Sequence, residues 1–185
     1  MDAGITILGF AGSLRKDSHN KAILRAAHEL VPHDGRLETF DLEGIPPFNQ
    51  DLENQPPERV NEFKAKIRAA DAILIATPEY NYSIPGVLKN AIDWASRPYG
   101  DSALEGKPVA VMGASIGMLG TARAQYHLRQ CFVFLNMYPV NQPEVMVPFA
   151  ADKVDKSGRV TDQKTREMIR ALLGSLIAWT RKLKA

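Results

Sequence analysis

Residues 5–20 read ITILGFAGSLRKDSHN, an apolar run followed by a polar turn and the start of a helical pattern. The run Ile5–Ala11 carries no charged residue and is predicted to be a buried β-strand. The turn that follows it, Gly12–Asn20, is rich in hydroxyl and amide side chains and leads directly into a helix. This order of strand, polar turn and helix predicts an α/β fold.

The polar turn has the features of an anion-binding site. Free backbone N–H groups at a helix start, the helix dipole and the charge of Arg15 all favour a phosphate. Ser18 is also suited to be a simple N-cap, with Arg15 a solvated surface charge. We prefer the phosphate interpretation because helix N-termini bind anions readily, and we therefore expect a phosphorylated ligand.

Short apolar runs alternate with longer segments of helical period along the rest of the chain. Further strands are predicted at residues 37–42, 72–77 and 109–114 and within 137–147. Helices are predicted around residues 23–31, 63–70, 87–95, 128–135 and 169–177. The alternation predicts a parallel sheet covered on both faces, and the absence of repeats or linkers predicts one domain over residues 1–185.

Composition narrows the class of protein. The 23 basic and 21 acidic residues give a net charge of +2, which indicates neither a nucleic-acid nor a membrane partner. The start of the chain lacks a secretory signal and no apolar run is long enough to span a bilayer, so we expect a cytoplasmic protein. One cysteine and four scattered histidines form no disulfide and no metal-ligand pattern.

Two later segments also follow predicted strands. Residues 77–86 read TPEYNYSIPG, in which prolines stiffen a loop that carries aromatic and amide side chains. Residues 113–123 read GASIGMLGTAR, in which three glycines would let the backbone approach a ligand. Because ligands bind beyond the carboxyl ends of parallel strands, these loops and the polar turn are predicted to form one site for a phosphate and a flat polar ring.

The same residues carry a family resemblance. The segments GSLR with Ser18 and Asn20, PEYN at 78–81 and IPGVLKNAIDW at 84–94 resemble the NADPH-dependent FMN reductase family of flavodoxin-like folds. Residues 113–126 resemble in particular its bacterial chromate and quinone reductase branch. The resemblance implies a three-layer sandwich with a five-stranded parallel sheet of order 2-1-3-4-5, bound FMN, and NADPH or NADH as electron donor. It also implies a homodimer or homotetramer that reduces quinones, chromate, azo compounds or free flavin.

The resemblance also implies which residues bind FMN. Its phosphate would be held by Ser13, Arg15, Ser18 and Asn20. Its isoalloxazine ring would be bordered by Pro78, Glu79, Tyr80 and Asn81, with Ser115 and Gly117 at the pyrimidine side. No catalytic side chain is required, because flavin N5 carries the chemistry. Donor and acceptor would use one slot in turn, which predicts ping-pong kinetics, and residues 48–51 would approach the flavin of a neighbouring subunit.

Two other functions compete with this interpretation. Residues 113–117, GASIG, match the G-x-S-x-G elbow of serine hydrolases, but the only later histidine is His127, a dozen residues on in a predicted helix. A non-enzymatic flavodoxin-type electron carrier would also bind FMN, without oxidising NAD(P)H. The reductase interpretation accounts for all three loops and is the one we favour.

Overall fold

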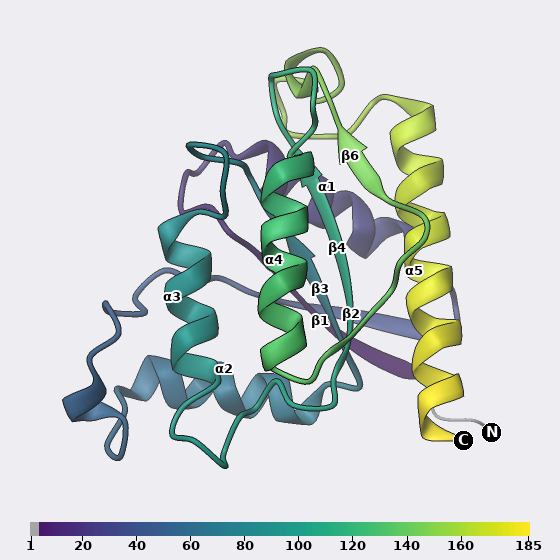
Figure 1. The fold of residues 1–185 in the computed structure, drawn as a ribbon. Helices are drawn as coiled ribbons and strands as arrows, with labels where there is room; N and C mark the ends of the chain where they lie inside the picture. Colours follow the sequence, from purple (N-terminus) through teal and green to yellow (C-terminus); the bar gives the residue numbers. More distant parts are fainter. Residues whose placement is uncertain (1–3) are drawn as a thin grey trace.

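A computed structural model describes residues 4–185; residues 1–3, which begin the predicted domain, lie outside the described residues. The strands form one parallel sheet in the order β2-β1-β3-β4-β5, with β6 also paired to β4 (Figure 1). They are β1 (Ile5–Ala11), β2 (Gly35–Phe40), β3 (Ala72–Ala76), β4 (Pro108–Ala114), β5 (Tyr138–Pro139) and β6 (Val145–Val147). The predicted flavodoxin-like α/β fold and strand order are confirmed.

The fifth position of the sheet holds two short strands instead of one. β5 pairs with the start of β4 at Pro108 and Val109, and β6 pairs with its end at residues 112–114. Pro139 and Pro143 lie in or between the two strands, and proline has no N–H to donate to a ladder. The region predicted to contain the fifth strand therefore pairs in two pieces.

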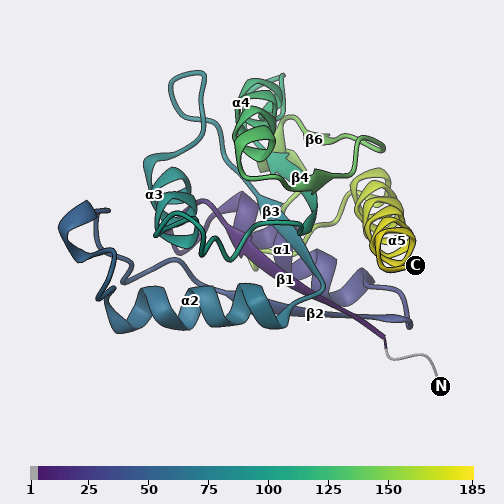
Figure 2. The same ribbon diagram turned by 60° about the horizontal axis from the view of Figure 1, so that its bottom comes forward.

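Helices cover both faces of the sheet, as Figures 1 and 2 show. They are α1 (His19–Leu30), α2 (Glu58–Ala69), α3 (Gly86–Ala95), α4 (Ala122–Phe134) and α5 (Gln163–Lys184), with short 3-10 turns η1 (Gln50–Leu52) and η2 (Ala150–Asp152). Side chains alternate along each strand between the two faces. Ile7 and Leu74 pack with α1 and α5, whereas Leu8 and Ile73 pack with α2, α3 and α4.

The long segment between β2 and α2 projects beside α3. Pro46 O accepts hydrogen bonds from Trp94 Nε1 at 2.8 Å and from Asn90 Nδ2 at 2.9 Å. The Phe48 ring packs edge-on against the Trp94 ring, with centroids 5.0 Å apart. The segment is therefore anchored to α3 at its base, while Asn49, Gln50 and Asp51 are exposed.

Because the strands are parallel, their carboxyl ends lie at one edge of the sheet. The loops that follow β1, β3 and β4 meet there, and the register pairs Ala11 with Ala76, and Ala76 with Met112. The strand order reverses between β1 and β3, and open α/β sheets bind their ligands at such a switch point. Among the helices of residues 4–185, none has the length and apolar character needed to cross a membrane.

Candidate functional site

A cleft of about 310 Å³ lies where the three loops meet. The polar turn after β1 contributes Ser13, Arg15, Ser18, His19 and Asn20 to its walls. The loop after β3 contributes Pro78, Glu79 and Tyr80, and the loop after β4 contributes Ala114, Ser115 and Ile116. Eight of the ten residues predicted to bind a ligand thus line one cavity, whereas Asn81 and Gly117 are exposed neighbours of its lining residues.

The polar turn presents the N-terminus of α1 to the cleft. Ser18 is the N-cap, and its side chain accepts hydrogen bonds from the N–H groups of Asn20 and Lys21. Ser13 Oγ accepts a hydrogen bond from the backbone N–H of Arg15 at 3.3 Å. The first turn of α1 contains no acidic residue, so nothing there opposes an anion at the positive end of the helix dipole.

Arg15 lies at the mouth of the cleft with an exposed side chain. Its Nε and Nη2 atoms donate to the carbonyl of Asp17, at 3.2 and 2.5 Å, which folds the guanidinium back over the turn. A guanidinium has further N–H donors in a planar fork that matches a phosphate. The structure therefore leaves Arg15 able to contact an anion bound at the start of α1.

Asn20 makes a contact that the sequence did not indicate. Its buried side chain donates from Nδ2 to Ala114 O and accepts at Oδ1 from Ala114 N, both at 2.9 Å. These two bonds join the start of α1 to the end of β4, 94 residues away in the sequence. Asn20 thereby fixes the spacing between the polar turn and the loop that begins at Ser115.

His19 also lines the cleft, although it is not among the ten residues predicted to bind FMN. Its Nδ1 atom is buried and has no hydrogen-bond partner within the described part of the chain. Burial and the nearby charge of Arg15 lower the pKa of His19, so the imidazole is neutral at neutral pH. A buried polar atom without a partner is costly unless a ligand or water satisfies it. The His19 Nδ1 atom, together with the hydroxyls of Ser13 and Ser18, fits the phosphate end of FMN.

The loop after β3 is a tight two-residue turn. Tyr80 and Ser83 exchange backbone hydrogen bonds at 3.1 and 3.0 Å, and Asn81 and Tyr82 between them have φ values of 51° and 67°. Two positive φ angles are the mark of a type I′ turn, which is usual for asparagine but strained for tyrosine. The turn exposes the rings of Tyr80 and Tyr82 beside the cleft.

Glu79 connects this loop to α4. The N-cap of α4, Thr121, has a left-handed backbone (φ 75°) and makes no side-chain cap. Glu79 supplies the missing acceptor: its Oε2 receives the N–H groups of Arg123 and Ala124 at 3.0 and 3.2 Å, and its Oε1 receives Arg123 Nε at 2.5 Å. The Arg123 guanidinium in turn lies 3.5 Å from the centroid of the Tyr82 ring. The second and third loops therefore form one connected wall.

The loop after β4 does not form a hydrolase elbow. Ser115 Oγ accepts a hydrogen bond from the Gly117 N–H at 3.1 Å, and it makes no other hydrogen bond among residues 4–185. His127, the later histidine of the hydrolase alternative, pairs through Nδ1 with Ser83 Oγ at 3.0 Å. Ser115 thus has no histidine base bonded to it, and a triad is not assembled.

The glycines of this loop differ in what surrounds them. A Cβ on Gly113 would lie 2.5 Å from Thr77 O, and a Cβ on Gly120 would lie 2.7 Å from the backbone of Met146. These two glycines pack against the chain itself and not against a ligand. Gly117 has only Ser115 Oγ nearby, at 3.6 Å, so its backbone is open to approach. The expectation of close backbone approach to a ligand thus fits Gly117 alone.

The described residues 4–185 contain no group of three or more histidine, cysteine, aspartate or glutamate side chains placed to hold a metal ion. Cys131 is half-buried on α4, where burial raises the pKa of its thiol. It lies outside the residues that line the cleft.

Comparisons with known proteins match this geometry. The family model described as NADPH-dependent FMN reductase matches residues 5–152. An NAD(P)H-dependent FMN reductase of Pseudomonas aeruginosa is 52% identical over 185 residues, which are 100% of both chains. A 2-hydroxy-1,4-benzoquinone reductase of a Burkholderia species is 44% identical over 92% of this chain and 93% of its own. The solved structure of the NAD(P)H:(acceptor) oxidoreductase FerB of Paracoccus denitrificans superposes with a TM-score of 0.88 at 36% identity, over 96% of this chain and 98% of that one.

Proposed function

The chain belongs to the NADPH-dependent FMN reductase family, and we propose that quinones are its electron acceptors. It is an FMN-dependent oxidoreductase that uses NAD(P)H. When bound, FMN supplies the redox chemistry, taking up hydride from the nicotinamide and returning electrons to the acceptor. What the chain must supply is a grip on the phosphate, a surface for the ring and a slot for the substrates.

The side chains around the cleft support quinones as the electron acceptors. Tyr80, Tyr82 and Ile116 expose 53%, 68% and 71% of their surface at or beside the cleft. Exposed aromatic and aliphatic side chains favour a flat, weakly polar acceptor. Chromate, a small dianion, would gain little from these groups. The name of the Burkholderia relative, a benzoquinone reductase, supports the same choice.

The polar turn would hold the FMN phosphate through the hydroxyls of Ser13 and Ser18, the guanidinium of Arg15 and the start of α1. Asn20 would position this turn against Ala114, as its two hydrogen bonds indicate.

The loop after β3 would border the ring with Pro78, Tyr80 and Asn81. The backbone N–H groups of Glu79 and Asn81 have no partner among residues 4–185, whereas that of Tyr80 is bonded to Ser83 O. The two free N–H groups are able to stabilise negative charge on a reduced ring. From the loop after β4, Ser115 and Gly117 would meet the pyrimidine side.

We further propose that donor and acceptor share one slot, so that initial-rate plots at several quinone concentrations give parallel lines. Chromate, azo compounds and free flavin would be poorer acceptors than benzoquinone by kcat/KM. The single domain over residues 1–185 and the cytoplasmic location are predictions from the sequence, and the homodimer or homotetramer is an implication of the family resemblance.

The direct test is a spectroscopic titration of the FMN-loaded protein under nitrogen. NADPH is expected to bleach the yellow colour, and stoichiometric benzoquinone is expected to restore it. Bleaching without recovery on quinone addition would refute the proposed acceptor, and intersecting initial-rate lines would refute the shared slot.

Replacing Arg15 with alanine tests the phosphate grip. The change removes one exposed charge-assisted contact, and we expect the FMN Kd to rise about tenfold while the fold is retained. Fluorescence quenching of FMN measures the Kd, and circular dichroism checks the fold. An unchanged Kd would remove Arg15 from the phosphate site.

A further inference from the structure

A second cleft of about 310 Å³ adjoins the phosphate end of the first. It lies between α1 and the turn at residues 154–158, and it shares Arg15, Ser18 and His19 with the first cleft. The buried Nδ1 of His19 thus belongs to a residue that lines both cavities. A volume of this size is at the lower end of the range of small-molecule sites, about 300–1,000 Å³. A ligand that extends beyond the first phosphate would enter this second cleft.

Cationic side chains line the second cleft. Arg25 crosses it from α1 and donates from Nη2 to Gly158 O at 3.1 Å. Lys156 is exposed on the opposite wall and, within residues 4–185, forms no hydrogen bond or ion pair. With Arg15 at the junction, three cations face the cavity, against the two carboxylates of Asp17 and Asp155. This arrangement suits an anionic group between Arg25 and Lys156.

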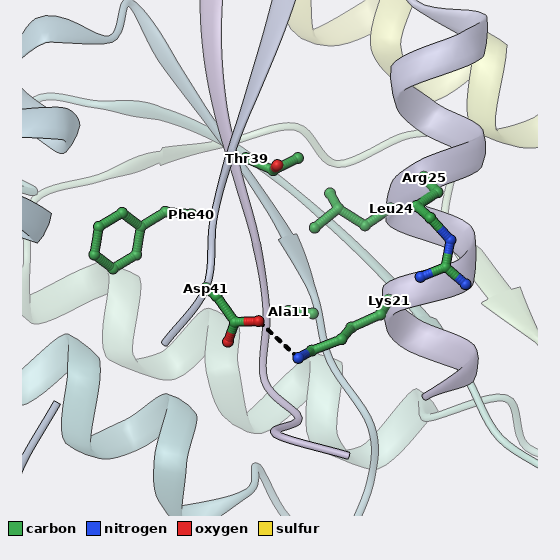
Figure 3. Close-up of a pocket in the computed structure, with 7 residues that line it drawn as sticks. All are labelled: Ala11, Lys21, Leu24, Arg25, Thr39, Phe40 and Asp41. Carbon is green, nitrogen blue, oxygen red and sulfur yellow. Dashed lines mark hydrogen bonds and ion pairs between the residues drawn. The ribbon is translucent and has the colours of Figure 1, made fainter. Parts of the chain in front are cut away.

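In a third cavity, beside α1, the lining lysine is paired with a carboxylate, unlike Lys156 in the second cleft (Figure 3). That cavity has a volume of about 170 Å³, and its Lys21 is neutralised by Asp41 at 2.7 Å. The guanidinium of Arg25 lies apart from this pair in Figure 3. Arg25 is therefore not neutralised by Asp41, and its charge is available to the second cleft.

The second cleft also offers an acceptor and an apolar wall. Asp155 Oδ1 receives the N–H and O–H of Ser157 and the N–H of Arg159, at 2.9, 2.6 and 3.0 Å. The bond from Ser157, with these other contacts, lowers the pKa of Asp155, which is therefore ionised at neutral pH. Its Oδ2 has no partner among the described residues, while Ala22 and Val154 add apolar surface. Cations for a phosphate, a carboxylate for hydroxyls and an apolar wall for a base together match an adenosine phosphate.

We propose that the second cleft binds the adenosine phosphate portion of a dinucleotide, with Arg25 and Lys156 on its phosphate and Asp155 on its ribose hydroxyls. The inference rests on the proposed function, because it places FMN phosphate in the first cleft. Two dinucleotides carry this group. One is FAD, whose first phosphate would lie where that of FMN lies; the other is the NAD(P)H cosubstrate.

The test is a calorimetric titration of adenosine 5′-monophosphate into the FMN-loaded protein. We expect binding in the wild type, and about tenfold weaker binding in Lys156→Gln and in Arg25→Gln, since each loses one charge-assisted contact. Lys164→Gln, at an exposed lysine of α5 outside the cleft, is the matched control and should bind like the wild type. Arg25→Gln also loses the bond to Gly158, so Lys156→Gln, which breaks no hydrogen bond, keeps the test independent of folding.

Two further measurements on the same variants distinguish FAD from NAD(P)H as the dinucleotide that occupies the second cleft. If FAD is the ligand, Lys156→Gln weakens FAD binding and leaves FMN binding unchanged. If the cosubstrate is the ligand, the same change raises the KM for NADPH and leaves FAD binding unchanged. The inference would be overturned if the wild type bound no adenosine 5′-monophosphate at millimolar concentration and if Lys156→Gln had the same FAD affinity and the same KM for NADPH as Lys164→Gln. If the proposed function is wrong, benzoquinone will not restore the yellow colour of the reduced protein. The calorimetric titration does not depend on that result and can still be interpreted.

Discussion

Asn20 and Ser18 are two residues apart in the polar turn, yet their polar atoms bind different parts of the chain. Ser18 caps its own helix, which its residue type and position predict. Asn20 binds both backbone groups of Ala114, a contact between segments that only the fold brings together. Hydrogen bonds within a helix cap can be predicted from the sequence, whereas the two bonds between Asn20 and Ala114 cannot.

Gly113→Ala tests the packing of the loop after β4. The new Cβ would meet Thr77 O at 2.5 Å and Thr121 Oγ1 even closer, and we expect a loss of about 1–3 kcal/mol in the free energy of unfolding. Urea denaturation measures this loss.

Gly117→Ala is the matched control. Its Cβ would meet only Ser115 Oγ at 3.6 Å, so stability should stay within about 0.5 kcal/mol of the wild type. FMN affinity, in contrast, should fall, because the methyl group narrows the approach to the ring. Equal stability of the two variants would contradict this division between packing and binding glycines.

Among the secondary-structure elements, strands are predicted well where nearly every residue is buried. β1 has the predicted bounds Ile5–Ala11, and β4 begins one residue before the prediction, at Pro108. β2 begins at Gly35, two residues earlier than predicted, because this edge strand buries only Leu37 and Phe40, so its apolar run is interrupted. The division of the last strand into β5 and β6 depends on pairing with β4, which the sequence does not reveal.

Glu79→Ala tests the junction between the second loop and α4. The change leaves three N–H groups without their acceptor, and we expect a loss of about 1–3 kcal/mol in the free energy of unfolding. Asp93→Ala is the control, because it breaks the exposed Lys89–Asp93 pair within α3, worth about 0.5 kcal/mol. A Glu79 variant no less stable than the Asp93 variant would show that the junction is not held by this carboxylate.

Asp162→Asn tests the acid end of the stability profile. The side-chain bond and then the backbone bond from Thr165 lower the pKa of Asp162, the N-cap of α5, below its ordinary value of 3.8. A lowered folded-state pKa contributes stability above 3.8, which is lost as the pH falls through the folded pKa.

Asparagine keeps the cap without the titration, so the variant should match the wild type at pH 7 within about 0.5 kcal/mol. Below pH 4 it should lose less stability than the wild type. Urea midpoints at pH 7 and pH 3 measure both. Identical midpoint shifts in the two proteins would show that Asp162 does not contribute to the acid transition.

At the scale of the whole molecule, the topology assembles the site. The loops after β1, β3 and β4 are far apart in the sequence, and the parallel sheet brings them to one edge in Figure 1. This convergence is predictable because it follows from strand direction alone. The partners of Glu79 and the buried Nδ1 of His19 are not predictable in this way, because they depend on how the loops pack.

A crystal structure of the protein with bound FMN would locate the cofactor directly. We expect the phosphate at the start of α1, in contact with the hydroxyls of Ser13 and Ser18, and the ring across the loops at 78–81 and 115–117. FMN bound elsewhere, or a cleft that stays empty in excess FMN, would contradict the proposed site.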